Sequence, residues 1–278
     1  MHADAAGFIA EAAAFLRAAE VENSMIATPA LRMATAPSED DVGIYLASVS
    51  DGEKVVAAAF HGGSGGILLS AAPDAAMALI ARDIADRVRK PEGLVGPLTS
   101  CEAFARAWRE RTGQAHVLRF HLRHFELTAN PVASPASGHL RVPDPGERPL
   151  ITDWQEAFLD EAGLPDDKER TRRNLARRIE RGLARVWDDG GAVAFVGFGE
   201  GAAATARIAP VYTPPRFRGR GYASAMVAAL SCELFAAGKR AIFLTTDVAN
   251  PTSNDIYLRI GFRPVADHFH FDFVAPPA

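Results

Sequence analysis

Residues 212–223 read YTPPRFRGRGYA, and this stretch decides how the second half of the chain is interpreted. The apolar run 202–211 precedes it and is typical of a strand, and the apolar-periodic segment 221–237 follows it and predicts a helix. The first amide groups of a helix have no intrahelical partner, and the helix dipole favours negative charge at that end. A strand, a glycine turn and a helix in this order therefore predict an anion-binding site.

The turn itself has the spacing R-x-x-G-x-G, formed by Arg216, Gly219 and Gly221. Glycine lets the backbone approach a phosphate group without a Cβ atom in the way. Arg218 and Arg220 add two further guanidinium groups, whose fork of donors suits phosphate oxygens. We therefore expect the bound anion to be a phosphate.

The arginine cluster is a local concentration of positive charge in a chain that is acidic overall. The chain has 278 residues, of which 48% are hydrophobic and 23% charged, and its formal net charge is −4. At roughly 100–200 residues per domain, this length predicts one large domain or two ordinary ones. An acidic net charge argues against a general nucleic-acid-binding protein, so we expect no nucleic-acid partner.

Cysteine usage and the chain's first residues bear on location. Cys101 and Cys232 are too few for a disulfide framework and lack a metal-binding spacing, so we expect both to be small core residues. The first residues, MHAD, contain no basic segment, and no run approaches the ~20 apolar residues of a membrane span. The sequence thus predicts a cytoplasmic protein without a membrane partner.

The first half predicts a mixed α/β arrangement. A linker rich in Pro, Ser, Gly and Ala covers residues 128–149, and we place the domain boundary between residues 130 and 131. This gives an N-terminal domain over 1–130 and a C-terminal domain over 131–278. Before the boundary we expect helices over 4–20, 73–89 and 100–112, a loop containing Pro29 and Pro37, and strands over 43–49, 54–60, 67–70 and 114–127.

The second half repeats the order of helices, hairpin, strand, helix, strand, helix and strand. Asn250 and Pro251 indicate the start of its last helix. No residue-level repeat accompanies this shared order. The expected helices are 152–161, 166–182, 221–237 and the one after Asn250, and the expected strands are 139–142, 184–188, 192–199, 202–211, 241–247 and 262–274.

Three features of the second half together resemble the GCN5-related N-acetyltransferase (GNAT) superfamily. They are the R-x-x-G-x-G turn, the apolar strand 241–247, and the sequence NPTSNDIY at 250–257 followed by Gly261-Phe262. The resemblance is clear over residues 184–275. It implies a mixed-sheet GNAT fold in the C-terminal half and a degenerate GNAT-like copy as one interpretation of the N-terminal half.

The resemblance also implies a site for acetyl-CoA as co-substrate. The turn amides of the family hold the pyrophosphate, and its preceding strand binds the pantetheine arm and polarises the thioester carbonyl. Asn250 and Asn254 match positions that contact the coenzyme arm. The residues implied in cofactor binding are Val211, Tyr212, Thr213, Arg216, Arg218, Gly219, Arg220, Gly221, Tyr222, Ala223, Asn250, Asn254 and Tyr257.

Tyr257 matches the tyrosine that protonates the departing thiolate in many relatives. A phenol has an ordinary pKa near ~10 and a thiol near ~8.5, so this transfer is chemically reasonable. The alternative is a packing aromatic on an amphipathic helix. The general base is not evident, with Glu200, Asp247, His268 and His270 as candidates by residue type. His268 and His270 share one face of a predicted strand and could form a pair of metal ligands. No third ligand has recognisable spacing, so we expect no metal.

These observations predict an N-acetyltransferase that moves an acetyl group from acetyl-CoA to a primary amine by direct attack. A non-catalytic acyl-CoA-binding or sensor protein is the first alternative, and an interaction protein using the arginine cluster is the second. The acceptor amine, the acyl-chain preference and the oligomeric state, with a homodimer among the options, stay open.

Overall fold

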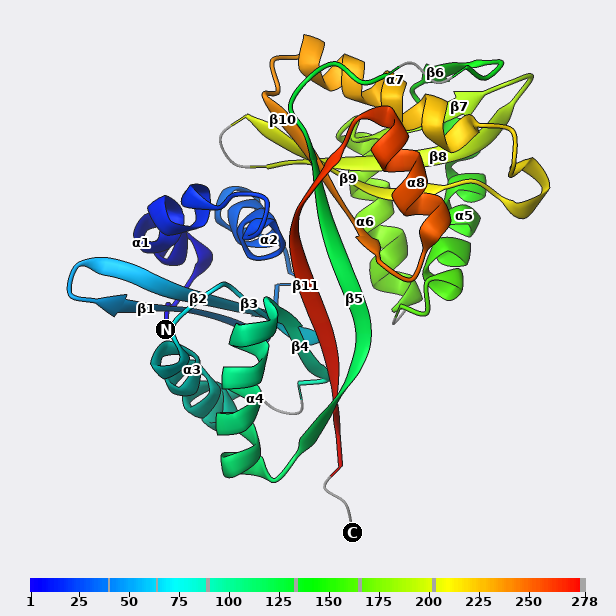
Figure 1. Ribbon diagram of the computed structural model, residues 1–278. Helices are drawn as coiled ribbons and strands as arrows, with labels where there is room; N and C mark the ends of the chain where they lie inside the picture. Colours follow the sequence, from blue (N-terminus) through cyan, green and yellow to red (C-terminus); the bar gives the residue numbers. More distant parts are fainter. Residues whose placement is uncertain are drawn as a thin grey trace. The chain divides into compact units, whose positions relative to one another are not determined.

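The computed structural model describes residues 1–39, 41–63, 65–88, 91–132, 135–164, 167–201 and 204–275 (Figure 1). The chain divides into two compact units. The first contains residues 1–124, 246–250 and 265–278, and the second contains residues 125–245 and 251–264.

The first unit builds a sheet with a pair of helices on either face. Its sheet has the order β1-β2-β3-β4 followed by the C-terminal part of β11, with β1–β2 and β2–β3 antiparallel and β3–β4 parallel. The elements that this unit contains wholly or in part are α1 (Ala5–Ala18), α2 (Ser24–Thr35), β1 (Ile44–Asp51), β2 (Lys54–Gly62), β3 (Gly66–Leu69), α3 (Asp74–Arg87), β4 (Gly93–Gly96), α4 (Leu98–Thr112), β5 (Ala115–Leu127), β10 (Ala241–Asp247) and β11 (Arg263–Val274).

Strand β2 shows how the sequence separates the two faces. Ala58 and Phe60 pack in a cluster with α1 and α2, whereas Ala57 and Ala59 pack in a cluster with α3 and α4. Successive side chains of a strand point to opposite faces, so an uninterrupted apolar strand supplies both layers. This strand is therefore buried on both sides.

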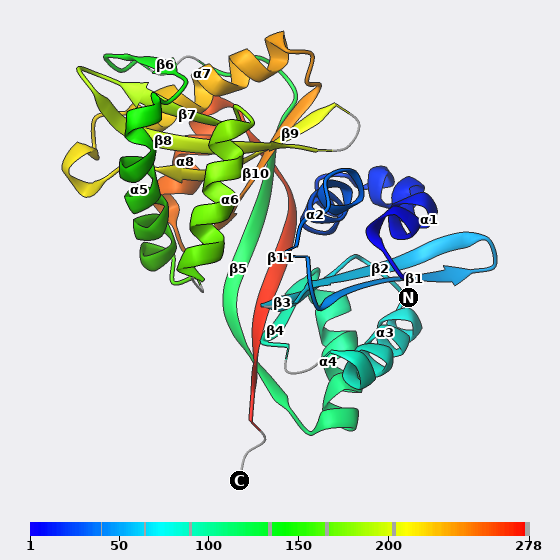
Figure 2. The same cartoon turned by 180° about the vertical axis from the view of Figure 1, so that it is seen from behind.

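The second unit has the same architecture. Its sheet has the order β10-β9-β8-β7-β6, and helices lie on both faces (Figure 2). The elements that this unit contains wholly or in part are β5, β6 (His139–Arg141), η1 (Pro145–Glu147), α5 (Arg148–Glu161), α6 (Lys168–Glu180), β7 (Ala184–Asp188), β8 (Ala192–Glu200), β9 (Thr205–Tyr212), η2 (Pro215–Phe217), α7 (Tyr222–Ala236), β10 (Ala241–Asp247), α8 (Pro251–Ile260) and β11.

Two apolar clusters hold the layers of this unit together. Phe195 of β8 packs with Trp154 and Leu175 beneath α5 and α6. The neighbouring Val196 faces the opposite way and packs with Met226 of α7 and other residues of a larger cluster. Residues 139–141, 184–188 and 192–200 thus form strands where the sequence predicts them, and the faces alternate as the pattern requires.

The two units share one order of elements: two helices, three strands, a helix, a strand, a helix and a strand, with β6 as an addition to the second. In each unit the third and fourth strands of this series are parallel, β3 with β4 and β9 with β10. The shared order and the mixed α/β sheets confirm the predicted fold class.

Three expectations were wrong. Residues around Pro29 form α2, because Ile26, Ala30 and Met33 bury one face of this helix against α1 and β2. That burial outweighs the cost of a proline inside a helix. The short strand β4 was missed, since its GLVG sequence gives almost no alternation. Cys101 is buried as expected, but Cys232 lies on the exposed side of α7.

The boundary between the compact units does not fall at the position placed from the sequence. The units divide between His124 and Phe125, six residues before the predicted position, and β11 begins in the second unit and ends in the first. No helix among the described residues is long and apolar enough to cross a membrane.

Candidate active site

The turn between β9 and α7 has the conformation of an anion site. Gly219 and Gly221 adopt left-handed backbone angles, with φ of 77° and 80°, which only glycine adopts without strain. Helix α7 starts at Tyr222 with no side-chain cap and no acidic residue in its first turn. Within the described residues, no hydrogen bond is found from the amides of residues 219–224. This leaves a row of donors for a ligand.

The three arginines of the turn have different surroundings. Arg218 donates to the Thr213 carbonyl oxygen over 2.8 Å and to a Glu161 carboxylate oxygen over 2.5 Å. Arg216 lies over the ring of Phe217, 4.7 Å from its centroid. Arg216 and Arg220 are exposed. Arg218 thus fixes the shape of the turn, and the other two guanidinium groups face solvent.

The residues on either side of the arginines are anchored. Tyr212 donates to a Glu161 carboxylate oxygen over 2.8 Å. Burial is the larger cause, and this hydrogen bond the second, of the raised pKa of the Tyr212 phenol. Tyr222 donates to Asp189 over 2.5 Å, and this bond holds the pKa of that carboxyl below its usual range. The buried Thr213 hydroxyl has no partner among the described residues. A buried polar atom without a partner is costly, so this hydroxyl is available to a ligand.

Strand β9 separates from β10 just before the turn. The two strands are in parallel register over three positions, the last being Arg207 opposite Phe243. Beyond that position β9 continues through Val211 to Tyr212 without a further register partner in β10. Residues 208–212 form this backbone edge, and they lie within the strand end, residues 208–213, for which the resemblance implies contact with the pantetheine arm.

Tyr257 lies on α8 inside the core of the second unit. Its side chain is 7% exposed, and its ring lies 5.8 Å from that of Phe262 and 6.4 Å from that of Phe125. Burial raises the pKa of this phenol, so it carries its proton at neutral pH. Tyr257 is therefore a packing residue that also holds a proton.

The two asparagines fall in different compact units. Asn250 belongs to the first unit, where its backbone N–H donates to the Asp247 carbonyl oxygen over 3.0 Å. Asn254 lies on α8 in the second unit. The remaining predicted cofactor residues, 211–213, 216, 218–223 and 257, all belong to the second unit.

The candidate bases are not brought together. Glu200, in the second unit, forms an ion pair with Lys239 over 3.2 Å. Asp247, His268 and His270 belong to the first unit, where Asp247 accepts the Ala249 amide over 2.9 Å. Burial lowers the pKa of His268 to about 4. Within the described residues no group of three metal-binding side chains is found.

Three residues with a part in this region were missed from the sequence. Glu161 ends α5 and joins Tyr212 to Arg218. Arg178, on the charged helix α6, donates to the Ala209 carbonyl oxygen of β9. Arg207 interrupts the apolar run of β9, and that lone charge in a strand was the available signal.

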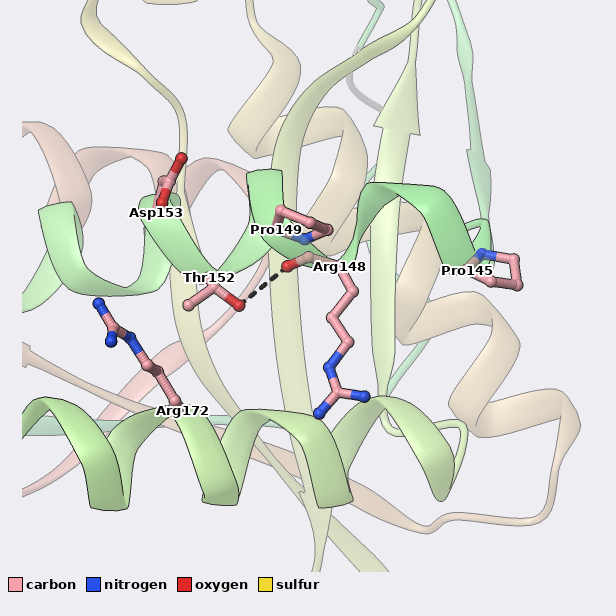
Figure 3. A pocket seen from close by; sticks show the side chains of 6 residues that line it. All are labelled: Pro145, Arg148, Pro149, Thr152, Asp153 and Arg172. Carbon is pink, nitrogen blue, oxygen red and sulfur yellow. Dashed lines mark hydrogen bonds between the residues drawn. The ribbon is translucent and has the colours of Figure 1, made fainter.

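An open groove between α5 and α6 lies apart from these residues. It is lined by Arg148, Thr152 and Arg172 together with Pro145, Pro149 and Asp153, and Figure 3 shows Thr152 donating to the Arg148 carbonyl oxygen over 2.9 Å. None of the predicted cofactor residues lines it. The groove therefore carries no argument for the coenzyme site.

Comparison with known proteins supports the resemblance. Residues 148–262 match the model of the acetyltransferase (GNAT) family, and no curated protein matches the chain in sequence. A GCN5-related N-acetyltransferase from Sphaerobacter thermophilus is 17% identical, covers 88% of this chain and 85% of its own, and gives a TM-score of 0.59. A relative from Kribbella flavida is 16% identical, with 87% and 94% covered and a TM-score of 0.54.

A tandem GNAT protein from the clavulanic acid biosynthesis pathway is 14% identical, covers 90% of this chain and 88% of its own, and gives a TM-score of 0.53. At these identities the structures share the fold. They confirm a GNAT fold that extends over most of the chain, consistent with a two-domain architecture.

Proposed function

We propose that this chain, whose residues 148–262 match the acetyltransferase (GNAT) family model, moves an acetyl group from acetyl-CoA to a primary amine. The family and the fold support an acyl-CoA-dependent acyltransferase in general. The observation that carries the proposal is the uncapped N-terminus of α7 behind two left-handed glycines and three arginines. These groups fit the pyrophosphate of the coenzyme.

The separated edge of β9 is the proposed place of the pantetheine arm and the thioester. Pro210 has no amide hydrogen, and its neighbours in residues 208–212 face no register partner in β10. Backbone donors aimed at the thioester oxygen stabilise the charge that develops there. The nitrogen of the amine forms a bond to the carbonyl carbon, the carbon–sulfur bond breaks, and no covalent bond to the enzyme forms.

Tyr257 is the proposed proton donor to the departing thiolate. A phenol carries its proton at neutral pH, as this role requires, and burial raises the pKa of this one further. The amine must also lose a proton, and none of the candidate bases is assigned to that step. A cytoplasmic location and a homodimer stay predictions.

Replacing Tyr257 by Phe tests the enzyme against the sensor alternative. The change removes only the hydroxyl, so we expect the folded core to persist and turnover to fall by roughly 10- to 1000-fold, while the Kd for acetyl-CoA stays within about twofold. Thiol release, followed with a panel of primary amines, measures turnover, and calorimetry measures binding. Unchanged turnover in the variant would assign Tyr257 to packing alone. A wild type that binds acetyl-CoA but acetylates no amine would favour the sensor.

A further inference from the structure

Two arginine side chains meet on the side of β9 that faces α5 and α6. Arg178 reaches from α6 and donates to the Ala209 carbonyl oxygen. It passes over Gly197 of β8, where a Cβ atom would collide with the guanidinium group and with that same oxygen. Arg207 precedes Ala209 by two residues on β9 and points to the same face, since Ala206 and Ile208 pack in the opposite cluster with α7.

Neither guanidinium has a carboxylate partner among the described residues. The buried Nε atom of Arg207 forms no hydrogen bond within the same set. Two glutamates of α5 pair with other arginines, Glu156 with Arg172 over 2.6 Å and Glu161 with Arg218 over 2.5 Å. Two half-buried positive charges thus lie on one side of β9 without a carboxylate among the described residues.

The pKa values of the two guanidinium groups agree with this geometry. Burial, and then the charge of Arg207, lowers the pKa of Arg178 to about 10, and burial lowers the pKa of Arg207 as well. Burying unpaired charges is costly, so buried charges in folded proteins are normally paired. The missing partner is therefore an anion that arrives with a ligand.

The position of the pair identifies the ligand. Arg207 occupies the last register position before β9 and β10 separate, and Ala209 lies on the edge that follows. We propose that Arg178 and Arg207 bind a carboxylate of the substrate whose acyl transfer takes place at this edge. This inference rests on the proposed function and adds a substrate class to it. The carboxylate is only bound, so the bonds that form and break stay those of acyl transfer.

A carboxylate could reach this position from two sources with the same chemistry. One is the acceptor, which would then be an amino acid. The other is a dicarboxylic acyl group on the coenzyme, such as a succinyl group. Guanidinium groups bind either one through paired, charge-assisted hydrogen bonds.

The test compares matched substrates by thiol release. Phenylalanine, leucine and glycine are each assayed beside their primary carboxamides with acetyl-CoA, so that only the negative charge differs. Succinyl-CoA is assayed beside acetyl-CoA with the carboxamides as acceptors. The proteins are the wild type, Arg207→Gln, Arg207→Lys and the control variant Arg181→Gln. Arg181 is an exposed arginine at the C-terminal end of α6. Replacing an unpaired buried charge by Gln removes a cost of folding, so the variant is expected to fold.

Two comparisons decide the result: the amino acids against their carboxamides, and succinyl-CoA against acetyl-CoA. In one of them we expect the wild type to show a kcat/KM for the carboxylate-bearing substrate that exceeds that of its neutral match by roughly 10- to 100-fold. Arg207→Gln should remove this preference by slowing the carboxylate-bearing substrates far more than their neutral matches, Arg207→Lys should restore part of it, and Arg181→Gln should keep it. A preference for the amino acids assigns the carboxylate to the acceptor, and a preference for succinyl-CoA assigns it to the acyl group.

The proposal is overturned if neither series is preferred, or if Arg207→Gln slows charged and neutral substrates equally. It is also overturned if the protein binds acetyl-CoA but neither turns over nor binds any carboxylate-bearing member of the panel. Calorimetric titration with acetyl-CoA separates these results from failure of the proposed function, because a folded wild type that does not bind acetyl-CoA contradicts the coenzyme site itself.

Discussion

Single residues of the candidate site divide into groups that shape it and groups that face a ligand. Glu161 holds Tyr212 and Arg218, so Arg218 is fixed before any coenzyme arrives. Fixing a charged side chain in advance lowers the entropy that binding would otherwise lose. Arg216 and Arg220 keep exposed guanidinium groups. The sequence identified all three arginines, but Glu161 carried no signal because its role depends on the packing of α5 against β9, which the local sequence does not specify.

His268 gives a prediction about stability and pH. It is 3% exposed, its ring lies 4.4 Å from that of His124, and burial lowers its pKa from 6.5 to about 4. Between these pH values the unfolded chain binds a proton that the folded chain does not, so stability falls as the pH drops through this window. The full loss, reached below pH 4, is about 3 kcal/mol.

Replacing His268 by Gln, which does not titrate, should remove this part of the acid sensitivity. Urea unfolding at pH 7.5 and at pH 5.0 measures it, with the exposed His139→Gln as the matched control. A His268→Gln protein that loses as much stability as the wild type between the two pH values would show that this histidine is not buried in its neutral form.

Among the elements, the turn into α7 gives the most specific prediction. Gly221 and Gly238 flank this helix, with φ of 80° and 87°. An alanine at either position is strained by about 1–2 kcal/mol, so both substitutions should lower the Tm by a similar few degrees. Only Gly221→Ala also places a methyl group in the proposed pyrophosphate site, so only this variant should weaken binding of acetyl-CoA.

Thermal unfolding and calorimetry on the two glycine variants separate strain from binding. Equal loss of acetyl-CoA affinity in both would mean that the strained backbone, and not the site, is responsible.

Elements with strong local signals were predictable from the sequence, and those that depend on packing were not. The period of apolar residues predicted α7, and glycine and proline marked the turn before it and the start of α8. Proline at position 29 argued for a loop, yet the apolar face of Ile26, Ala30 and Met33 makes a helix. The lone Arg207 was hidden in an apolar strand because its environment comes from α6, which is distant in sequence.

At the scale of the whole molecule, the two compact units exchange the C-terminal ends of their last strands: residues 125–127 of β5 belong to the second unit and residues 265–274 of β11 to the first. Phe125 and Leu127 of β5 are 2% and 3% exposed and belong to the apolar core of the second unit, whereas Phe271 of β11 belongs to that of the first. The shared order of elements was predictable from the sequence. This exchange was not, because periodicity places a strand along the chain but does not say which sheet receives it.

The exchange predicts how the chain tolerates cutting. A shortened chain of residues 131–278 keeps the family-matched segment but loses two large core side chains, and losing even one such side chain costs about 2–5 kcal/mol. We expect it not to unfold cooperatively, as judged by near-ultraviolet circular dichroism and thermal unfolding. A chain of residues 113–278, which restores Phe125 and Leu127, should recover structure. A stable, cooperative 131–278 fragment would contradict the exchange.

Calorimetric titration of the full chain with acetyl-CoA tests the central claim most directly, beside an Arg216→Ala/Arg218→Ala variant and an Arg181→Ala control. We predict one site per chain in the wild type and the control, and roughly 100-fold weaker binding in the double variant, since Arg216 would contribute a charge-assisted hydrogen bond to the pyrophosphate and Arg218 fixes the shape of the turn. A well-folded wild type that does not bind acetyl-CoA, or a double variant that binds it as tightly, would contradict the proposed coenzyme site at the start of α7.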